Sequence, residues 1–376
     1  MNFALTEDQA MIRDAAQSFL ADESGSAAVR AAMESDTGFD AGVWRRIGSE
    51  LGWCGIPVPE AYGGLGLGPV ELTLVLEQMG RHLLCAPYFS TVCLATNVLA
   101  QLASAEGRQR FLPGIAAGEL RATVPLPEGA DDWRAAPLSA RRDGGGWELS
   151  GQCAEVPDGA GADWLLLFAK VQGQARLGLF AVPCDARGLR INALKGWDAT
   201  RRFAAVELQQ VKITADSRID DPSRVEDGLV RAAALARLAI AAEQLGGAQQ
   251  CLDLTVGYTA TRKQFGRAVA SFQAVKHRCA EMMVRIEATR SAVYGAAAFA
   301  AGEASAEAQA IECAVARSLA SDTFFYCAQE AIQLHGGVGF TWEYDPQLYF
   351  KRAQASSHWL GSADALRERI AQALIA

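Results

Sequence analysis

Two short segments carry residue types that can bind phosphate groups. The first, the arginine segment, spans residues 262–273 and reads Arg262-Lys263-Gln264-Phe265-Gly266, followed by Ser271-Phe272-Gln273. An arginine can hold a pyrophosphate with two parallel hydrogen bonds, and the rings of Phe265 and Phe272 could flank an adenine. The same residues also fit a plain turn between helices, with Gly266 ending a helix and both phenylalanines in the core. The residues alone leave both interpretations open.

The second segment, the glycine turn, spans residues 333–340 and reads Gln333-Leu334-His335-Gly336-Gly337-Val338-Gly339-Phe340. Glycine after a long helix is the commonest helix end. Without side chains, glycines also let backbone amides approach phosphate or ribose oxygens. A pair of glycines does not decide between these two roles.

Long helices are expected to position both segments. Apolar residues recur at steps of three and four after residue 226, and they predict helices over about 226–260, 271–302 and 305–335. Helices of about 30 residues that pack side by side form a bundle. The arginine segment then joins the first two helices, and the glycine turn ends the third.

The rest of the chain divides into two further parts. Residues 1–120 read as helical, beginning with a capping box between Thr6 and Gln9. Short apolar runs at 164–168, 177–182 and 204–208 predict strands with no helix between them, hence an antiparallel β-domain over 121–225. The expected fold class is α+β: an N-terminal helical domain (1–120), a middle antiparallel β-domain (121–225) and a C-terminal helical bundle (226–376).

Composition excludes several classes of protein. The 376 residues include 35 Lys and Arg against 43 Asp and Glu, a net charge of −8, which argues against a nucleic-acid binder. No uninterrupted apolar run approaches the roughly 18 residues of a membrane span. The nine cysteines show no C-x-x-C spacing, so neither a zinc site nor a dithiol redox motif is indicated, and no metal-binding residues are expected. The charged N-terminal stretch does not read as a signal peptide, and we expect a cytoplasmic protein.

The segments together resemble the acyl-CoA dehydrogenase family over nearly the whole chain. Residues 59–66, Pro-Glu-Ala-Tyr-Gly-Gly-Leu-Gly, are similar to its N-terminal glycine-rich signature. The arginine segment is similar to its R-x-x-F-G…F-Q pattern, and the glycine turn to its Q-x-x-G-G-x-G-F pattern. The resemblance implies a C-terminal four-helix bundle and FAD bound between subunits. The β-domain of one subunit would hold the flavin ring, and the arginine segment and glycine turn of its neighbour the ADP half.

The activity that the resemblance implies is oxidation of a CoA thioester to its α,β-enoyl form, with a glutamate as base. Here the sequence departs from the family. Leu360 stands at the family's common base position, after Trp359, and Ala236 stands at the position used by a smaller branch. Neither side chain can accept a proton.

The flavin half of the site also departs from the family pattern. Glu155 stands where a tryptophan would lie against the flavin, and Pro157 stands where a hydroxyl would point to it. A loop with the T-E-P-x-x-G-S-D pattern matches residues 126–131 only loosely, in an uncertain register. The departures from the family pattern affect the chain's own active site, whereas the arginine segment and the glycine turn, which would bind the FAD of a neighbour, match the pattern.

This asymmetry resembles the non-catalytic subunit of heterotetrameric, steroid side-chain type acyl-CoA dehydrogenases. The expected partner is a catalytic subunit, in an assembly of two plus two that binds an acyl-CoA substrate. The residues expected to bind FAD are Arg262, Gln264, Phe265, Phe272, Gln273, Gln333, Gly336 and Gly337.

Two alternatives stay open. In the first, the chain is a homodimeric dehydrogenase with Glu243 as a relocated base. Glu243 lies seven residues, roughly 10 Å, along the helix from Ala236, and it also fits a buried glutamate paired with an arginine. In the second, the chain is a flavin-free acyl-CoA-binding or scaffold protein.

Overall fold

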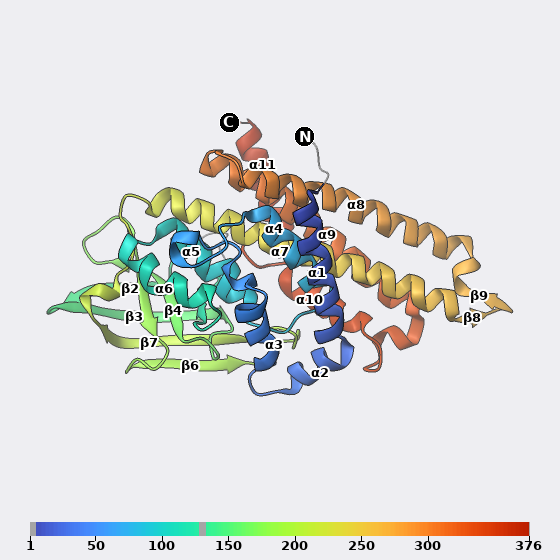
Figure 1. Ribbon diagram of the computed structural model, residues 1–376, viewed down its shortest axis with the longest axis horizontal. Helices are drawn as coiled ribbons and strands as arrows, with labels where there is room; N and C mark the ends of the chain where they lie inside the picture. Colours follow the sequence, from blue (N-terminus) through green and yellow to red (C-terminus); the bar gives the residue numbers. More distant parts are fainter. Residues whose placement is uncertain (1–4, 128–132, 376) are drawn as a thin grey trace.

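The structure is a computed structural model that describes residues 5–127 and 133–375. A twisted sheet occupies one end of the long axis, and the tips of the longest helices reach the other end (Figure 1). Helices from the N-terminal part of the chain lie against both the sheet and the long helices. Among the described helices, none is long and apolar enough to cross a membrane.

The N-terminal part is helical, as expected, and the capping box is confirmed. The Thr6 hydroxyl accepts a hydrogen bond from the Gln9 amide at 3.2 Å, and the Gln9 side chain accepts one from the Thr6 amide at 3.1 Å. The helices are α1 (Glu7–Glu23), α2 (Ser26–Glu34), α3 (Ala41–Arg45), α4 (Pro69–Arg81), α5 (Thr96–Leu102) and α6 (Ala105–Ala116). Shorter helical segments complete this part: the π-helical η1 (Arg46–Glu50) and η4 (Phe89–Ala95), and the 3-10 turns η2 (Trp53–Gly55) and η3 (Glu60–Tyr62).

The middle part forms one sheet. Its strands are β1 (Ala122–Thr123), β2 (Leu138–Asp143), β3 (Gly146–Pro157), β4 (Trp164–Val171), β5 (Leu177–Pro183), β6 (Leu189–Leu194) and β7 (Phe203–Ile213). The order along the sheet is β1-β4-β2-β3-β7-β6, and β5 pairs with β4. Strand β4 is buried on both faces, because Leu165 and Leu167 face the core of the sheet and Leu166 and Phe168 join the larger helical core.

The expectation of a purely antiparallel module is corrected in two places. β1 and β2 both pair with β4 in parallel, and the other pairs are antiparallel. The apolar pattern of a strand sets its burial but not the direction of its neighbour, so the sequence could not separate the two arrangements.

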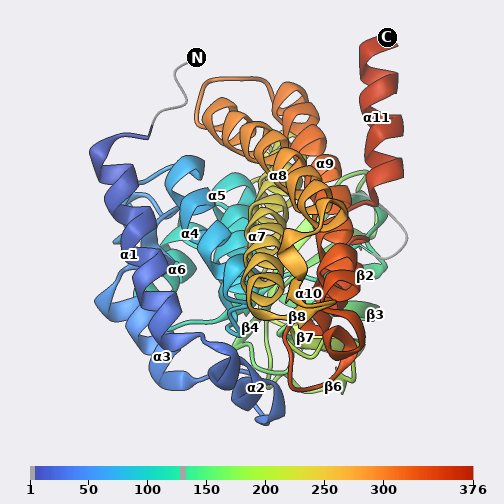
Figure 2. The same ribbon diagram turned by 90° about the vertical axis from the view of Figure 1, so that its right-hand side faces the viewer.

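The C-terminal part consists of long helices that match the expected ranges within a few residues. They are α7 (Val225–Thr261), α8 (Gln273–Ala300), α9 (Ala306–His335), α10 (Pro346–Ser356) and α11 (Ala363–Ile375). Helices α7, α8 and α9 lie side by side, α10 packs on α7 and α9 as the fourth helix of the bundle, and α11 packs on α9 (Figure 2). The division of the chain at residues 120 and 225 stays a prediction.

Two glycines allow α4 and α7 to approach closely. A Cβ atom built on Gly80 would lie 1.9 Å from the backbone oxygen of Glu243, and one on Gly246 would lie 1.8 Å from that of Glu77. Neither position has room for a methyl group. This contact fixes the N-terminal helices against the helix that leads into the arginine segment.

Candidate functional site

The arginine segment forms a tight hairpin at the tip of the bundle. Helix α7 ends at Thr261, and β8 (Lys263–Gln264) pairs with β9 (Arg267–Ala268) before the short turn η7 (Val269–Ser271) leads into α8. Phe265 and Gly266 make the hairpin turn with φ of 52° and 77°. Two consecutive residues with positive φ match the twist of a two-residue hairpin.

Phe265 is exposed in a way that the fold of one chain does not explain. Its side chain is 91% exposed, so it gains almost no burial. A positive φ is also unfavourable for a bulky residue. Its only aromatic contact in the described chain is an edge-to-face contact with Phe272, with ring centres 6.1 Å apart. A large apolar residue under these conditions indicates a surface that something else covers.

The other predicted residues of this segment lie around the hairpin. Arg262 is exposed, and no carboxylate among the described residues lies within ion-pair distance of its guanidinium. The Gln264 side chain is exposed and bonds to the backbone oxygen of Lys263 at 2.9 Å. Phe272 immediately precedes α8 and is half-buried, and Gln273 is the exposed first residue of that helix. Arg267, which sequence reasoning missed, stacks on Phe272 with its guanidinium 4.0 Å from the ring centre.

The glycine turn exposes its backbone. Gln333 is exposed in the last turn of α9, and Gly336 and Gly337 begin the short turn η8 (Gly336–Phe340). Gly336 has φ of 65° and ψ of −146°, a conformation that residues with a side chain rarely adopt. A Cβ atom on either glycine would meet nothing within 4 Å. The backbone here is therefore open to a ligand.

An aromatic stack brings the two segments together. Tyr258, one turn before Arg262, stacks on His335 with ring centres 4.4 Å apart, and His335 directly precedes Gly336. His335 Nδ1 lies 2.7 Å from the backbone oxygen of Ala331, which fixes the ring. Burial lowers the pKa of His335 and favours the neutral ring. Sequence reasoning gave Tyr258 and His335 no role, although the histidine lies within the motif.

The two segments therefore form one exposed surface with an unpaired arginine, exposed aromatic rings and open glycine backbone. These features fit a dinucleotide, since a pyrophosphate is held by arginine and amide donors and an adenine by stacking. The surface lies at the opposite end of the molecule from the sheet (Figure 1).

Comparison with known proteins identifies the family. Residues 6–119 match the N-terminal domain of acyl-CoA dehydrogenases, and residues 229–375 match the C-terminal domain. Acyl-CoA dehydrogenase IpdE2 of Mycobacterium tuberculosis is 31% identical over 365 residues, covering 97% of this chain and 96% of the relative. The chain belongs to the acyl-CoA dehydrogenase family. This family consists of oxidoreductases that use FAD.

Two solved relatives of this acyl-CoA dehydrogenase chain are complexes. A variant of the Tcur3481-Tcur3483 steroid acyl-CoA dehydrogenase has a TM-score of 0.87 at 32% identity, covering 98% of each chain. The ChsE4-ChsE5 complex from Mycobacterium tuberculosis has a TM-score of 0.89 at 28% identity, covering 100% of this chain and 99% of the other. The expected fold, from helical domain through β-domain to bundle, is confirmed.

The two base positions of this acyl-CoA dehydrogenase chain lie in packed core. Leu360 is 1% exposed and Ala236 is fully buried. Beside Leu360, Trp359 packs against the rings of Phe89 and Phe203, with ring centres 6.0 and 5.3 Å away. Neither base position offers a carboxylate, and aromatic side chains fill the space beside Leu360.

Two buried guanidinium groups hold the turn that contains Leu360. Arg237 donates from Nε to the backbone oxygen of Leu360 at 2.9 Å. Arg317 donates from Nη2 to the backbone oxygens of Ser356 at 2.6 Å and Trp359 at 3.3 Å. Burial, and secondly the charge of Arg237, lowers the pKa of Arg317 to about 9. The turn is thereby fixed by its backbone.

Glu243, the candidate for a relocated base, is held in an ion pair. Both of its carboxylate oxygens accept from Arg201 Nη2, at 2.7 and 2.8 Å, and Arg352 Nη1 lies 3.9 Å away. The Arg201 guanidinium in turn stacks on Phe89 and Trp359, 4.5 and 5.1 Å from their ring centres. Arg201 is buried, because Glu243 compensates its charge. The paired interpretation of Glu243 is therefore confirmed.

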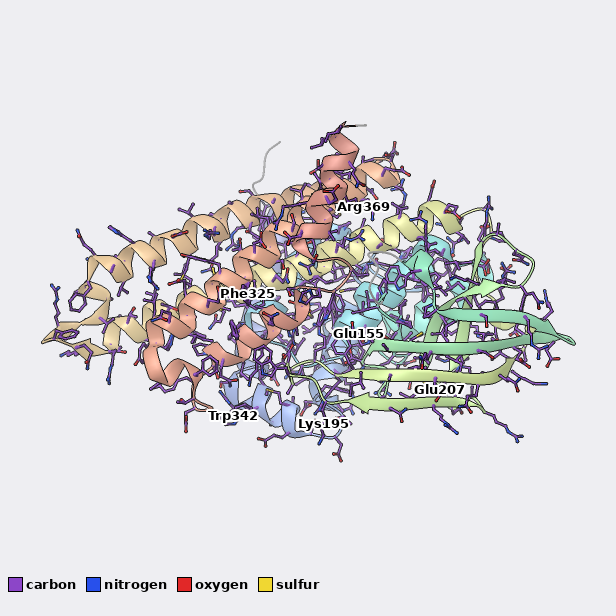
Figure 3. The ribbon with its side chains drawn as sticks, turned by 180° about the vertical axis from the view of Figure 1, so that it is seen from behind. Glu155, Lys195, Glu207, Phe325, Trp342 and Arg369 are labelled. Atoms are coloured by element: carbon purple, nitrogen blue, oxygen red, sulfur yellow. The ribbon has the colours of Figure 1, made fainter. Side chains whose placement is uncertain are left out.

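The flavin side of this chain does not match the family pattern. Glu155 is exposed where the sheet meets the helices (Figure 3), and Pro157 offers neither a hydroxyl nor an N–H group. A small apolar cavity of about 120 Å³ lies next to Leu126, Trp133, Cys153 and Phe168. Of the loop predicted at residues 126–131, residues 128–131 lie outside the described part of the chain. The described residues offer no donor where the family places its hydroxyl.

Proposed function

We propose that this chain is the non-catalytic subunit of a heteromeric acyl-CoA dehydrogenase. It contributes the ADP half of an FAD site to a catalytic subunit, which carries the glutamate base and the flavin ring. The observation that carries this proposal is the exposed surface at the tip of the bundle. There, Arg262, Phe265 and the Gly336-Gly337 backbone face outward, far from the chain's own sheet (Figure 1).

The residues of this surface have distinct proposed roles. The guanidinium of Arg262 binds the pyrophosphate, and the Gly336-Gly337 backbone allows its close approach. Phe265 and Phe272 flank the adenine, and the side chains of Gln264, Gln273 and Gln333 supply hydrogen bonds at the edge. The stack between Tyr258 and His335 keeps the two segments in register.

The reaction proposed for the assembly is α,β-dehydrogenation of a CoA thioester. The chemistry that bound FAD would supply is acceptance of a hydride from the β carbon of the thioester. The glutamate of the catalytic subunit would remove the α proton. This chain contributes no proton acceptor, since Leu360 and Ala236 occupy both base positions. Its role is to bind and orient the ADP half of FAD.

We propose an assembly of two copies of each subunit, acting on a CoA thioester with a bulky steroid-like acyl group in the cytoplasm. The two relatives described as Tcur3481-Tcur3483 and ChsE4-ChsE5 each combine two kinds of chain, and the first is a steroid enzyme. None of the nine cysteines forms a disulfide, which fits a reducing compartment.

The two alternatives have less support. A homodimeric enzyme would need Glu243 free to accept a proton, but its carboxylate is bound to Arg201 through both oxygens. A flavin-free scaffold would leave the exposed Phe265 ring and the unpaired Arg262 charge without a function. The scaffold alternative leaves the surface at the tip of the bundle without a role, and the homodimeric alternative, which would use that surface, lacks a free base.

A test uses variants of this chain in the assembled enzyme. The chain is co-expressed with an acyl-CoA dehydrogenase chain of the same genome that retains a glutamate base, and native mass and bound flavin are measured. Arg262→Gln should weaken FAD binding about tenfold or more, because it removes a charge-assisted double hydrogen bond. Lys263→Gln is the matched control: it removes the same charge from the next residue and should retain FAD. Equal retention by both variants would count against the proposal.

A further inference from the structure

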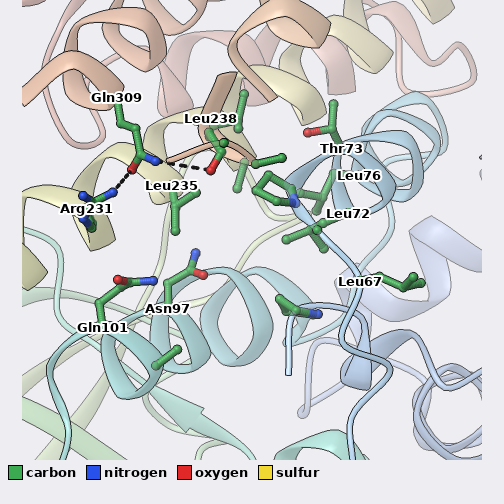
Figure 4. Close-up of a pocket in the computed structure, with 18 residues that line it drawn as sticks. Leu67, Leu72, Thr73, Leu76, Asn97, Gln101, Arg231, Leu235, Leu238 and Gln309 are labelled. Atoms are coloured by element: carbon green, nitrogen blue, oxygen red, sulfur yellow. Dashed lines mark hydrogen bonds between the residues drawn. The ribbon is translucent and has the colours of Figure 1, made fainter. Parts of the chain in front are cut away.

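A second cavity lies among the helices. It has a volume of about 370 Å³ and is bounded by α4, α5, α7 and the connection from α8 to α9 (Figure 4). Leu72 and Leu76 of α4 face Leu235 and Leu238 of α7 across it. Its volume lies within the range of small-molecule sites, which are mostly apolar with a few polar groups that orient the ligand.

One end of this cavity carries a positive charge. Arg231 donates from Nη1 to the side-chain oxygen of Gln309 at 2.8 Å and from Nη2 to the backbone oxygen of Ala304 at 2.9 Å. Both acceptors are neutral, and no carboxylate of residues 5–127 or 133–375 lies within 4.0 Å of this guanidinium. A partly buried cation without a counter-charge is a favourable site for an anion.

Two amides lie along the same side of the cavity. Asn97 is 6% exposed and donates to the backbone oxygen of Cys93 at 2.7 Å, which fixes its orientation. The side chain of Gln101, one turn further along α5, makes no hydrogen bond within the part of the chain that the structure describes. Both side chains lie near Arg231 in Figure 4. They can hydrogen-bond a polar group next to the charge.

The cavity is distinct from the base positions described above. On α7, residues 231, 235, 238 and 239 follow one another at helical spacing and form one face of the helix. Arg237 points to the opposite side, where it bonds to the Leu360 turn. The helix itself therefore separates the cavity from that turn.

We propose that this cavity binds an apolar molecule that carries a single carboxylate. The carboxylate pairs with Arg231 and is hydrogen-bonded by Gln101, and the apolar body lies against the leucines of α4 and α7. A straight acyl chain and a fused-ring acid share this chemistry. The site is independent of the proposed FAD surface, because it uses neither the arginine segment nor the glycine turn.

Calorimetric titration of the full chain tests this inference. The probes are decanoate for the acyl chain, cholate for the fused rings and decanol as the neutral analogue of decanoate. We expect saturable binding of at least one of the two acids, with one molecule per chain. The acid that binds shows whether the ligand is a straight-chain or a fused-ring acid. Decanol should bind about tenfold more weakly than decanoate, if decanoate is the ligand, since it lacks the charge-assisted hydrogen bond.

Variants assign the binding to this cavity. Arg231→Gln should weaken binding of the acid about tenfold, Arg231→Lys should restore part of it, and Leu235→Trp should abolish it by filling the space. Arg187→Gln, which removes an exposed charge elsewhere, is the control for net charge and should bind as the unaltered chain does. Thermal unfolding confirms that each variant is folded. Absence of saturable binding by both acids, or binding that Arg231→Gln and Leu235→Trp leave unchanged, would overturn the inference.

Discussion

Arg237 donates a hydrogen bond of 2.9 Å to the backbone oxygen of Leu360. This bond joins the two places where a base would be expected, because Arg237 follows Ala236 on α7 and Leu360 occupies the other position. Together with the hydrogen bonds of Arg317, it fixes the turn that contains Leu360 in the core. Neither of these two positions carries a side chain that can accept a proton.

The ion pair between Arg201 and Glu243 leads to a first prediction. Glu243→Gln should leave turnover of the assembled enzyme unchanged, because the carboxylate has a structural role. Breaking a buried ion pair costs about 3–5 kcal/mol, so the free energy of unfolding should fall, as measured by urea denaturation. Arg201→Gln is the matched variant, since it breaks the same pair and keeps the carboxylate. If turnover were lost in Glu243→Gln and kept in Arg201→Gln, Glu243 would be the base.

The close contact between α4 and α7 leads to a second prediction. Gly246→Ala places a methyl group 1.8 Å from the backbone oxygen of Glu77, and overpacking of this kind costs about 1–3 kcal/mol. Gly257→Ala in the same helix meets nothing within 4 Å and should stabilise the chain by up to about 1 kcal/mol, through helix propensity alone. Urea midpoints of the two variants should move in opposite directions. A shift of both in one direction would show that the two helices do not pack as described.

The exposed ring of Phe265 leads to a third prediction. Phe265→Asn removes the ring at a positive φ, which asparagine tolerates. The isolated chain should be as stable as before, within about 1 kcal/mol, whereas FAD should dissociate faster from the assembled enzyme. Phe265→Tyr keeps the ring and should retain FAD. A large loss of stability in the isolated Phe265→Asn chain would instead assign the ring to the fold.

A fourth prediction concerns pH. Burial raises the pKa of Asp158 to about 6, although its hydrogen bond from Ser90, 2.6 Å long, acts in the opposite direction. In the unfolded chain the carboxyl ionises near pH 4, so between about pH 4 and pH 6 the folded state binds more protons. Stability should therefore decrease as pH rises through this window, by about 3 kcal/mol, and then level off.

Asp158→Asn should remove that decrease, and asparagine tolerates the φ of 53° at this position. Asp185→Asn, at an exposed carboxyl, should leave the pH profile as it is. Thermal unfolding from pH 4 to pH 8 checks both variants. An unchanged slope in Asp158→Asn would mean that another group causes the dependence.

Much of the fold could be predicted, because its signals are local. The capping box of Thr6 and Gln9 and the long apolar periodicity of α7, α8 and α9 depend on residues close in sequence. The direction of β1 and β2 against β4, and the π-helical η4, depend on distant packing. Local patterns do not carry that information.

The candidate site divides in the same way. The arginine segment and glycine turn were found from their motifs, yet their exposure and their distance from the sheet required the structure. The stack of Tyr258 on His335 joins residues 77 positions apart, and the burial of Arg201 depends on Glu243 of helix α7. The cavity at Arg231 has no motif, because its walls combine α4 and α5 with α7 and the connection from α8 to α9, which are far away in sequence.

The most direct test of the central claim is the amount of FAD bound by this chain alone and by its complex with a catalytic subunit. The chain purified alone should contain no stoichiometric FAD and should not oxidise acyl-CoA thioesters. The complex should contain one FAD for each pair of unlike subunits and should be active. One FAD per chain in the isolated protein, together with turnover of an acyl-CoA, would contradict the account.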